Sequence, residues 1–258
     1  LSFNFGYPSA TMKNEHKNDV FNNCCKAALI LFKNNNSITE AIIIKALKDA
    51  TLGGAVSFDY NIVPEFVAAV TSYFDSANAP QGTYLISDFG GMTIDTACFE
   101  HKNDDGERKI IIYGSTAERF GVEVSKHCLK DLTETERLNF QTKILGKNVF
   151  SKTLKIAANK IPLHLPLWKG ELKTFIIGGG RHYFNYNLAL DWSMHSFVKS
   201  RYYTNYIPSE LLQELDIELP LISDNRSSQR LLVASGLSSE HLPSIVNSNQ
   251  PDDIAMSE

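Results

Sequence analysis

The sequence predicts an α/β protein, because segments with strand patterns alternate with segments that carry helical spacing. Short apolar runs bounded by Gly, Pro or Asn indicate the strands, and apolar residues three or four positions apart indicate the helices. The 258 residues are 43% hydrophobic and 21% charged, which is ordinary for a globular protein and sufficient for a buried core. This length fits one large domain or two small lobes.

The beginning of the chain carries one strand pattern and three helical patterns. The opening LSFNFGYP predicts a strand that Pro8 ends. Helices are expected at residues 9–31, 38–50 and 65–74. The polar run KNNNS at residues 33–37 separates the first two helices.

Residues 75–82 are rich in Ala, Asn, Pro and Gly, so they predict a boundary between two lobes. Strands beyond this boundary are expected at residues 84–86, 93–99, 109–113 and 173–177, with NDDG at residues 103–106 as a hairpin tip. Further helices are expected at residues 122–132, 134–158 and 227–237. Residues 244–258 are rich in Ser, Asn and Asp and predict a flexible tail.

Charge and cysteine content narrow the classes of function. Twenty-five basic and 29 acidic residues give a net charge of −4, which offers no electrostatic basis for binding nucleic acid or an anionic membrane. Cys24, Cys25, Cys98 and Cys128 lack metal-ligand spacing, so we expect reduced thiols buried as small hydrophobic residues.

Two features of the chain concern its location and extent. No run of eighteen apolar residues and no signal-peptide pattern occur in the sequence, which predicts a cytoplasmic protein. The sequence does not begin with Met and opens in a strand pattern. This beginning leads us to expect that the chain is part of something longer.

The stretch TYLISDFGGMTIDTA, residues 83–97, places acids on both sides of a Gly-Gly turn. The N–H groups of such a turn can approach phosphate oxygens because no Cβ intervenes. Acids would repel a bare phosphate, so Asp88 and Asp95 make sense if Mg²⁺ lies between carboxylate and phosphate. The Thr93 hydroxyl would add a donor. The alternative is an ordinary hairpin with solvated acids.

A second glycine cluster follows a later strand. TFIIGGGRHYF, residues 174–184, is an apolar strand that ends in three glycines and leads into an expected helix. This arrangement is typical of a nucleotide that passes close over the backbone. A plain strand-to-helix turn is the alternative, but such a turn rarely needs three consecutive glycines.

Together these blocks resemble the ATPase superfamily of actin, heat-shock chaperones and sugar kinases. DFGGMTID is similar to its second phosphate loop, which reads D-x-G-G-G-T-x-D in chaperones, and Met92 is the one departure. FIIGGGR resembles the adenosine motif, and VPEFVAAVTSYF resembles the chaperone stretch N-E-P-T-A-A-A-x-A-Y. FGYPSA, IYGSTAERFGVEV and RLLVASGL resemble further segments in the same order, so the likeness covers roughly residues 5–237.

The resemblance implies an actin-like ATPase (ribonuclease-H-like) fold, with a mixed five-stranded sheet flanked by helices. Residues 1–80 would be the remainder of an incomplete first lobe, and residues 81–222 would form the second lobe with both glycine loops. Residues 223–243 would be a helix that returns to the first lobe, ahead of the tail.

Site roles follow from the same resemblance. Asp88 would orient the Mg²⁺ shell or the attacking water, and Asp95 would be a second carboxylate near the metal. Glu65 matches a chaperone glutamate near that water, although its neighbours Pro64 and Phe66 differ from the family pattern. Residues expected to touch ATP or ADP are Gly90, Gly91, Met92 and Thr93 at the phosphates, and Gly178, Gly179, Gly180 and Arg181 at the nucleoside.

The family's first phosphate loop, D-x-G-[TS], does not occur ahead of Asp88 in this sequence. Phosphoryl transfer depends on positioning from both lobes, so the 258 residues alone should bind nucleotide weakly and hydrolyse it poorly. A first lobe would come from the same chain or from another. The expected function is Mg-ATP binding and slow hydrolysis in a chaperone-like or bacterial actin-like protein, coupled to lobe closure or self-assembly.

Two alternatives stay open. Met92, the altered surroundings of Glu65 and the missing first loop favour a non-catalytic module that keeps the fold and binds nucleotide or a protein partner. A sugar or acetate kinase is the other alternative, but no loop for an acceptor substrate is recognisable.

Overall fold

The computed structural model describes residues 2–7, 15–34, 38–74, 80–104, 106–161, 172–180, 183–184 and 242–247. The chain divides into two compact units, Leu1–Glu65 and Phe66–Glu258. This division falls ahead of residues 75–82, where the composition suggested a boundary.

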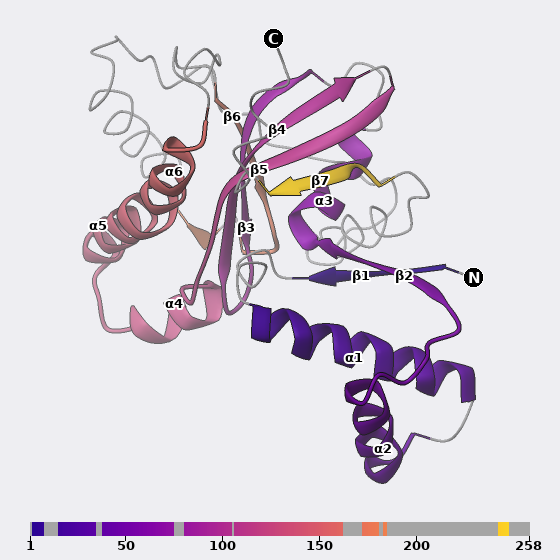
Figure 1. Cartoon of the computed structure of the whole chain (residues 1–258). Helices are drawn as coiled ribbons and strands as arrows, with labels where there is room; N and C mark the ends of the chain where they lie inside the picture. Colours follow the sequence, from indigo (N-terminus) through magenta and orange to yellow (C-terminus); the bar gives the residue numbers. More distant parts are fainter. Residues whose placement is uncertain are drawn as a thin grey trace, which may run out of the picture. The chain divides into compact units, whose positions relative to one another are not determined.

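The first unit contains a pair of parallel strands and two helices (Figure 1). Strand β1 (Ser2–Tyr7) pairs with β2 (Asp59–Pro64) along its whole length. Helix α1 (Glu15–Asn34) extends three residues beyond its expected end, and α2 (Glu40–Thr51) agrees closely with the predicted helix. The Thr39 side chain caps α2 by accepting the Ile42 N–H at 3.4 Å.

The second unit contains a five-stranded sheet in the order β6-β3-β4-β5-β7. Its strands are β3 (Gly82–Phe89), β4 (Ile94–Asp104), β5 (Glu107–Glu118), β6 (Lys173–Ile177) and β7 (Ser244–Asn247). Strands β3, β4 and β5 form an antiparallel meander, while β6 runs parallel to β3 and β7 runs parallel to β5. The predicted α/β class and the mixed five-stranded sheet with flanking helices are therefore confirmed.

One face of this sheet carries an aliphatic core. Because strand residues alternate between faces, Leu85 and Phe89 of β3 lie on the same side. They pack in one buried cluster with Val149 and Leu154, which come from the long helical segment after β5. This segment consists of α5 (Glu134–Ile144), the π-helical stretch η2 (Leu145–Phe150) and α6 (Ser151–Ala158), and it covers residues 134–158, where one helix was expected.

The other face of the sheet carries an aromatic core against helix α3 (Glu65–Phe74), which has the predicted bounds. The Phe74 ring lies 5.2 Å from Tyr84 of β3, and the Phe66 ring lies 5.5 Å from Phe99 of β4. Tyr84 also stacks on Phe175 of β6 at 5.1 Å. The sheet is therefore covered on both faces, by α3 on one and by α5–α6 on the other (Figure 1).

Several boundaries differ from the sequence predictions. Helix α4 (Val122–Cys128) ends earlier than residue 132, because Thr133 and Glu136 form a capping box that starts a new helix. Residues 244–247, predicted to be part of a flexible tail, instead form β7 on the free edge of β5. Residues 248–258 and the expected helix at 227–237 lie outside the described residues, as does most of the segment expected to return to the first lobe.

Two further findings concern cysteines and membranes. Cys25 and Cys98 are buried as predicted, whereas Cys24 and Cys128 are exposed, which corrects the expectation for these two residues; all four are free thiols. Within the part of the chain that the structure describes, no helix combines the length and the apolar character needed to cross a bilayer.

Candidate functional site

The turn between β3 and β4 is formed by Gly90, Gly91, Met92 and Thr93. The Gly90 N–H donates to the Thr93 carbonyl at 2.9 Å and closes the turn at its base. Gly91 and Met92 are exposed at its tip, and 66% of the Met92 surface is accessible. The four residues expected to contact phosphate are thus consecutive in one tight turn at the end of a buried strand.

The start of α4 holds this turn through its carbonyl groups. Three hydrogen bonds join them: Val122 N–H to Gly90 O at 3.0 Å, Glu123 N–H to Gly91 O at 2.8 Å, and Gly121 N–H to Met92 O at 3.0 Å. A Cβ on Gly121 would lie 2.4 Å from the Gly91 oxygen, closer than real contacts allow. Gly121 is therefore needed for this approach.

The hydrogen bonds to α4 also fix the direction of the N–H groups in the turn. In a trans peptide the C=O and the following N–H point in opposite directions, and the described residues contain no cis peptide. Since the carbonyls of Gly90, Gly91 and Met92 point toward α4, the N–H groups of Gly91, Met92 and Thr93 point away from it. No described residue accepts a hydrogen bond from these three N–H groups. Consecutive N–H groups of this kind form an anion-binding concavity.

The second glycine cluster lies directly beside this turn. Strand β6 runs parallel to β3 with Ile177 in register with Asp88, so the two strands end at the same edge of the sheet. Beyond β6, the Gly180 N–H donates to the Phe89 carbonyl at 2.7 Å. Gly178 adopts a φ of +92°, and a Cβ there would lie 2.3 Å from Asp88 Oδ1. Both glycines are thus required by close approach to the end of β3.

Gly179 is exposed between these two packed glycines. The structure therefore brings together the two glycine stretches that the sequence analysis identified. Gly180 of the second stretch contacts Phe89 and Gly90 of the first. Arg181, the remaining residue expected at the nucleoside, lies outside the described residues.

Asp88 and Asp95 lie directly opposite each other on β3 and β4. Side chains of such a cross-strand pair share one face of the sheet, with Cβ atoms about 4.5–5.5 Å apart. The Thr93 hydroxyl donates to Asp95 Oδ2 at 2.9 Å, while Asp95 Oδ1 is buried and has no hydrogen-bond partner in the described part of the protein. Burial raises the pKa of Asp95, and the hydrogen bond from Thr93 lowers it in part.

This pair of carboxylates is suited to a divalent cation. A cation between them would offset the repulsion of two like charges and would satisfy the buried Oδ1. Among the described residues, no cluster of three or more His, Cys, Asp or Glu side chains could hold a metal ion. Asp88 and Asp95 therefore fit Mg²⁺ bound largely through water and a ligand's phosphates, and they do not form a complete protein cage.

Glu65 is the last residue of the first compact unit. It is exposed as the first residue of α3 and belongs to the first compact unit, whereas the glycine segments and both aspartates belong to the second. An acid at a helix N-terminus is also favoured by the helix dipole.

Sequence reasoning missed three side chains beside the turn. Lys126 Nζ lies 3.5 Å from Glu123 Oε1 and 5.9 Å from the centre of the Tyr183 ring. The Lys126 side chain is 47% exposed. Nothing in the local pattern FGVEVSK revealed that Glu123 is next to Gly91, because that contact joins residues 32 positions apart in the chain.

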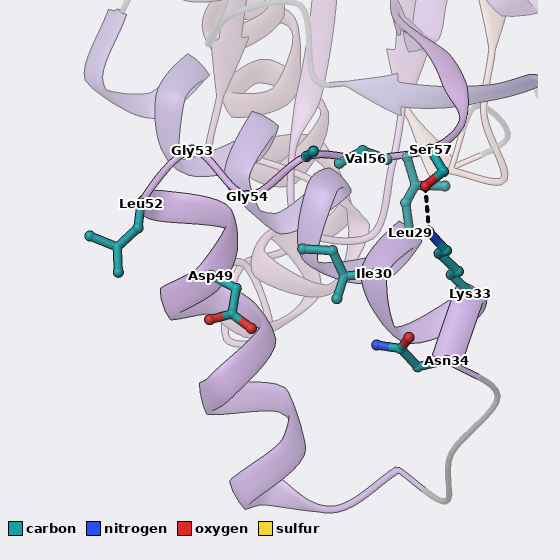
Figure 2. A pocket seen from close by; sticks show the side chains of 11 residues that line it. Leu29, Ile30, Lys33, Asn34, Asp49, Leu52, Gly53, Gly54, Val56 and Ser57 are labelled. Atoms are coloured by element: carbon teal, nitrogen blue, oxygen red, sulfur yellow. Dashed lines mark hydrogen bonds between the residues drawn. The ribbon is translucent and has the colours of Figure 1, made fainter.

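A separate hollow of about 480 Å³ lies in the first unit. Its walls come from the end of α1, the end of α2 and the segment that leads into β2, and Lys33 Nζ donates to Ser57 Oγ at 2.6 Å across it (Figure 2). Its apolar lining comes from Leu29, Ile30, Leu52, Ala55 and Val56. None of the residues predicted to bind nucleotide lines this hollow.

Neither a scan against protein-family models nor a search of curated proteins gives a match to this chain.

Proposed function

We propose that the second unit binds ATP or ADP with Mg²⁺ at the edge of its sheet where β3 and β6 end. One observation carries this proposal: the two glycine stretches that resemble a phosphate loop and an adenosine motif are in contact, through the Gly180 N–H and the Phe89 carbonyl at 2.7 Å. Ligands of α/β sheets commonly bind outside the carboxyl ends of parallel strands. The fold proposed for the whole protein is that of the actin-like ATPases.

The chemistry of the turn supports a phosphate ligand with a metal ion. The N–H groups of Gly91, Met92 and Thr93 would donate to phosphate oxygens, which needs no movement of the turn. Asp88 and Asp95 would repel that phosphate without a cation, so the ligand is expected to bind as its Mg²⁺ complex. When bound, Mg²⁺ would neutralise charge on the phosphates.

Hydrolysis would be slow and would require a complete first lobe. Asp88 is the proposed group that orients the Mg²⁺ shell or the attacking water, with Glu65 as the second proposed catalytic residue. The first phosphate loop would come from a segment outside these 258 residues, in the same polypeptide or in a partner. Turnover would then be coupled to lobe closure or to assembly, in the cytoplasm.

Calorimetric titration of the natural polypeptide with ATP tests this proposal. With Mg²⁺ present, binding is expected, and with EDTA it should be lost. Asp95→Asn should weaken Mg-ATP binding by about tenfold, because a charge-assisted contact to the metal shell is lost. Asp104→Asn is the matched control, since Asp104 is an exposed acid at the far end of the same strand. A correctly folded protein that does not bind Mg-ATP would exclude the proposal.

A second candidate function is a non-catalytic interaction module of the same fold. Several large apolar side chains on or beside α1 and α2 of the first unit are exposed, and exposed apolar surface can bind a protein partner. They are Val20, Phe32, Ile43 and Ile44, with Ile38 and Leu52 flanking α2. Mg-ATP binding without measurable phosphate release by the whole polypeptide would establish this candidate, whereas steady phosphate release would establish the ATPase.

A further inference from the structure

We infer that the Thr93 hydroxyl positions the cation ligand of the proposed nucleotide site and does not itself bind phosphate. It holds the Asp95 carboxylate so that one carboxylate oxygen is left for Mg²⁺. This inference rests on the proposed function and refines it. The sequence led us to expect a hydroxyl that donates to the nucleotide, whereas in the structure this donor is used by Asp95.

The Thr93 hydroxyl has only one proton to donate. A threonine hydroxyl combines a single O–H donor with two acceptor lone pairs. Thr93 donates to Asp95 Oδ2 at 2.9 Å, and a hydrogen bond to a carboxylate is stronger than one between neutral groups. A hydroxyl that turned to a phosphate oxygen would leave the Asp95 carboxylate without this donor, although its other oxygen already has no partner in the described part of the protein. The donor is therefore committed to Asp95.

The turn holds the Thr93 side chain in place. The Gly90 N–H donates to the Thr93 carbonyl at 2.9 Å, and a Cβ on Gly90 would lie 3.9 Å from Thr93 Oγ1. Threonine is branched at Cβ and has few side-chain rotamers. Residues two apart in an extended chain share one side, which agrees with the hydrogen bond from Thr93 to Asp95. The hydroxyl is thus fixed by the same turn whose N–H groups are proposed to bind phosphate.

The hydrogen bond determines which oxygen of Asp95 is left for a cation. Oδ2 is held by Thr93, whereas Oδ1 is buried and has no hydrogen-bond partner among the described residues. Leaving a buried carboxylate oxygen unsatisfied is unfavourable, and Mg²⁺ or a water of its shell would satisfy it. Asp88 lies directly opposite Asp95 on β3, so the cation would lie beside both carboxylates.

Holding the carboxylate favours cation binding through preorganisation. A carboxylate that can rotate loses this freedom when it binds a ligand, and the loss weakens binding. Because Thr93 fixes Oδ2, Asp95 has less freedom to lose when Oδ1 contacts the Mg²⁺ shell. The hydroxyl oxygen also keeps its lone pairs, which can accept a hydrogen bond from a metal-bound water. Thr93 therefore contributes to the affinity for Mg-ATP through Asp95.

Calorimetric titrations with ATP and with adenosine, both in the presence of Mg²⁺, test the inference. Thr93→Val removes the hydroxyl and keeps the branched shape of the side chain. It should weaken ATP binding about three- to fivefold and leave adenosine binding unchanged, because adenosine brings no phosphate-bound Mg²⁺. Thr93→Ser keeps the hydroxyl and should bind ATP within about twofold of the natural protein.

A double-mutant cycle with Asp95→Asn distinguishes the carboxylate from phosphate as the partner of Thr93. Asparagine has no charge to offer the cation, so adding Thr93→Val to Asp95→Asn should weaken ATP binding by less than about 1.5-fold. A hydroxyl that binds phosphate directly would lose the same three- to fivefold in both backgrounds. Thr135→Val is the matched control, because Thr135 is an exposed threonine of α5, and it should change ATP affinity by less than about 1.5-fold.

The outcomes separate this inference from the proposed function. If the natural protein binds Mg-ATP and Thr93→Val binds it equally well, the inference is wrong and the proposed function stands. The same holds if Thr93→Val has an equal effect with and without Asp95→Asn, since the hydroxyl would then bind phosphate. If Thr93→Ser is as weak as Thr93→Val, or if adenosine binding also falls, Thr93 only shapes the turn and the inference is again wrong. If the natural protein does not bind Mg-ATP, the proposed function fails and the inference fails with it.

Discussion

Replacing Gly178 by alanine should destabilise the second unit by roughly 2–5 kcal/mol. A φ of +92° costs a residue with a Cβ about 1–2 kcal/mol relative to glycine. The new Cβ would also lie 2.6 Å from the Phe89 nitrogen and oxygen. Backbone of a central strand cannot easily retreat, and such overpacking costs about 1–3 kcal/mol.

Gly106→Ala separates the cost of the positive φ from the cost of the close contact. Gly106 has a nearly equal φ of +90°, but a Cβ there meets nothing within 4 Å. Gly106→Ala should therefore lower the free energy of unfolding only by the cost of the positive φ, about 1–2 kcal/mol. Guanidinium unfolding followed by circular dichroism gives both free energies of unfolding, provided that the slope of free energy against denaturant is unchanged. Equal losses for the two variants would refute the close contact between the segment after β6 and the end of β3.

Three further predictions concern the charges and the core of the second unit. Burial raises the pKa of Asp95 above 3.8, so without divalent cations the stability should fall as pH rises above that value, and Asp95→Asn should remove this slope in unfolding experiments at several pH values. Burial lowers the pKa of His101, whose ring stacks on Phe74 at 4.0 Å, so the free energy of unfolding should fall as pH drops below 6.5. His101→Phe should abolish that decline. An unchanged pH profile in this variant would contradict the assignment to His101. Leu154→Ala should cost about 2–5 kcal/mol in the same unfolding assay, because Leu154 is fully buried between α6 and the sheet.

Local sequence patterns correctly predicted the elements whose ends are marked by Pro or Gly. Helix α3 starts after Pro64, and β6 ends at the first of three glycines, so the predicted bounds of both agree with the structure. The hairpin β4–β5 is longer than predicted, because its outer part is polar: Lys102 and Asn103 are paired with strand β5 although neither adds to an apolar pattern. Polar edges of a hairpin are specified by backbone pairing, which hydrophobic periodicity does not detect.

Local sequence patterns could not predict contacts between residues far apart in the chain. Strand β7 forms because Lys109–Ile112 of β5 offers backbone groups to Ser244–Asn247. The segment SIVN has only two apolar residues and lies in a stretch rich in Ser and Asn, so its local pattern is too short to predict a strand. In the candidate site, Gly90 and Gly178 were identified from the sequence, whereas the role of Gly121 depends on its distance to Gly91. Only the fold reveals which glycines face another segment at close range.

The three hydrogen bonds from α4 to the turn have a consequence for the energetics of any anion that binds there. A flexible glycine loop must lose conformational entropy when it orders around a ligand, and this loss weakens binding. Here the carbonyl groups of Gly90, Gly91 and Met92 are already fixed. The turn is therefore preorganised: its conformational entropy is lost when the protein folds, and little more is lost when an anion binds.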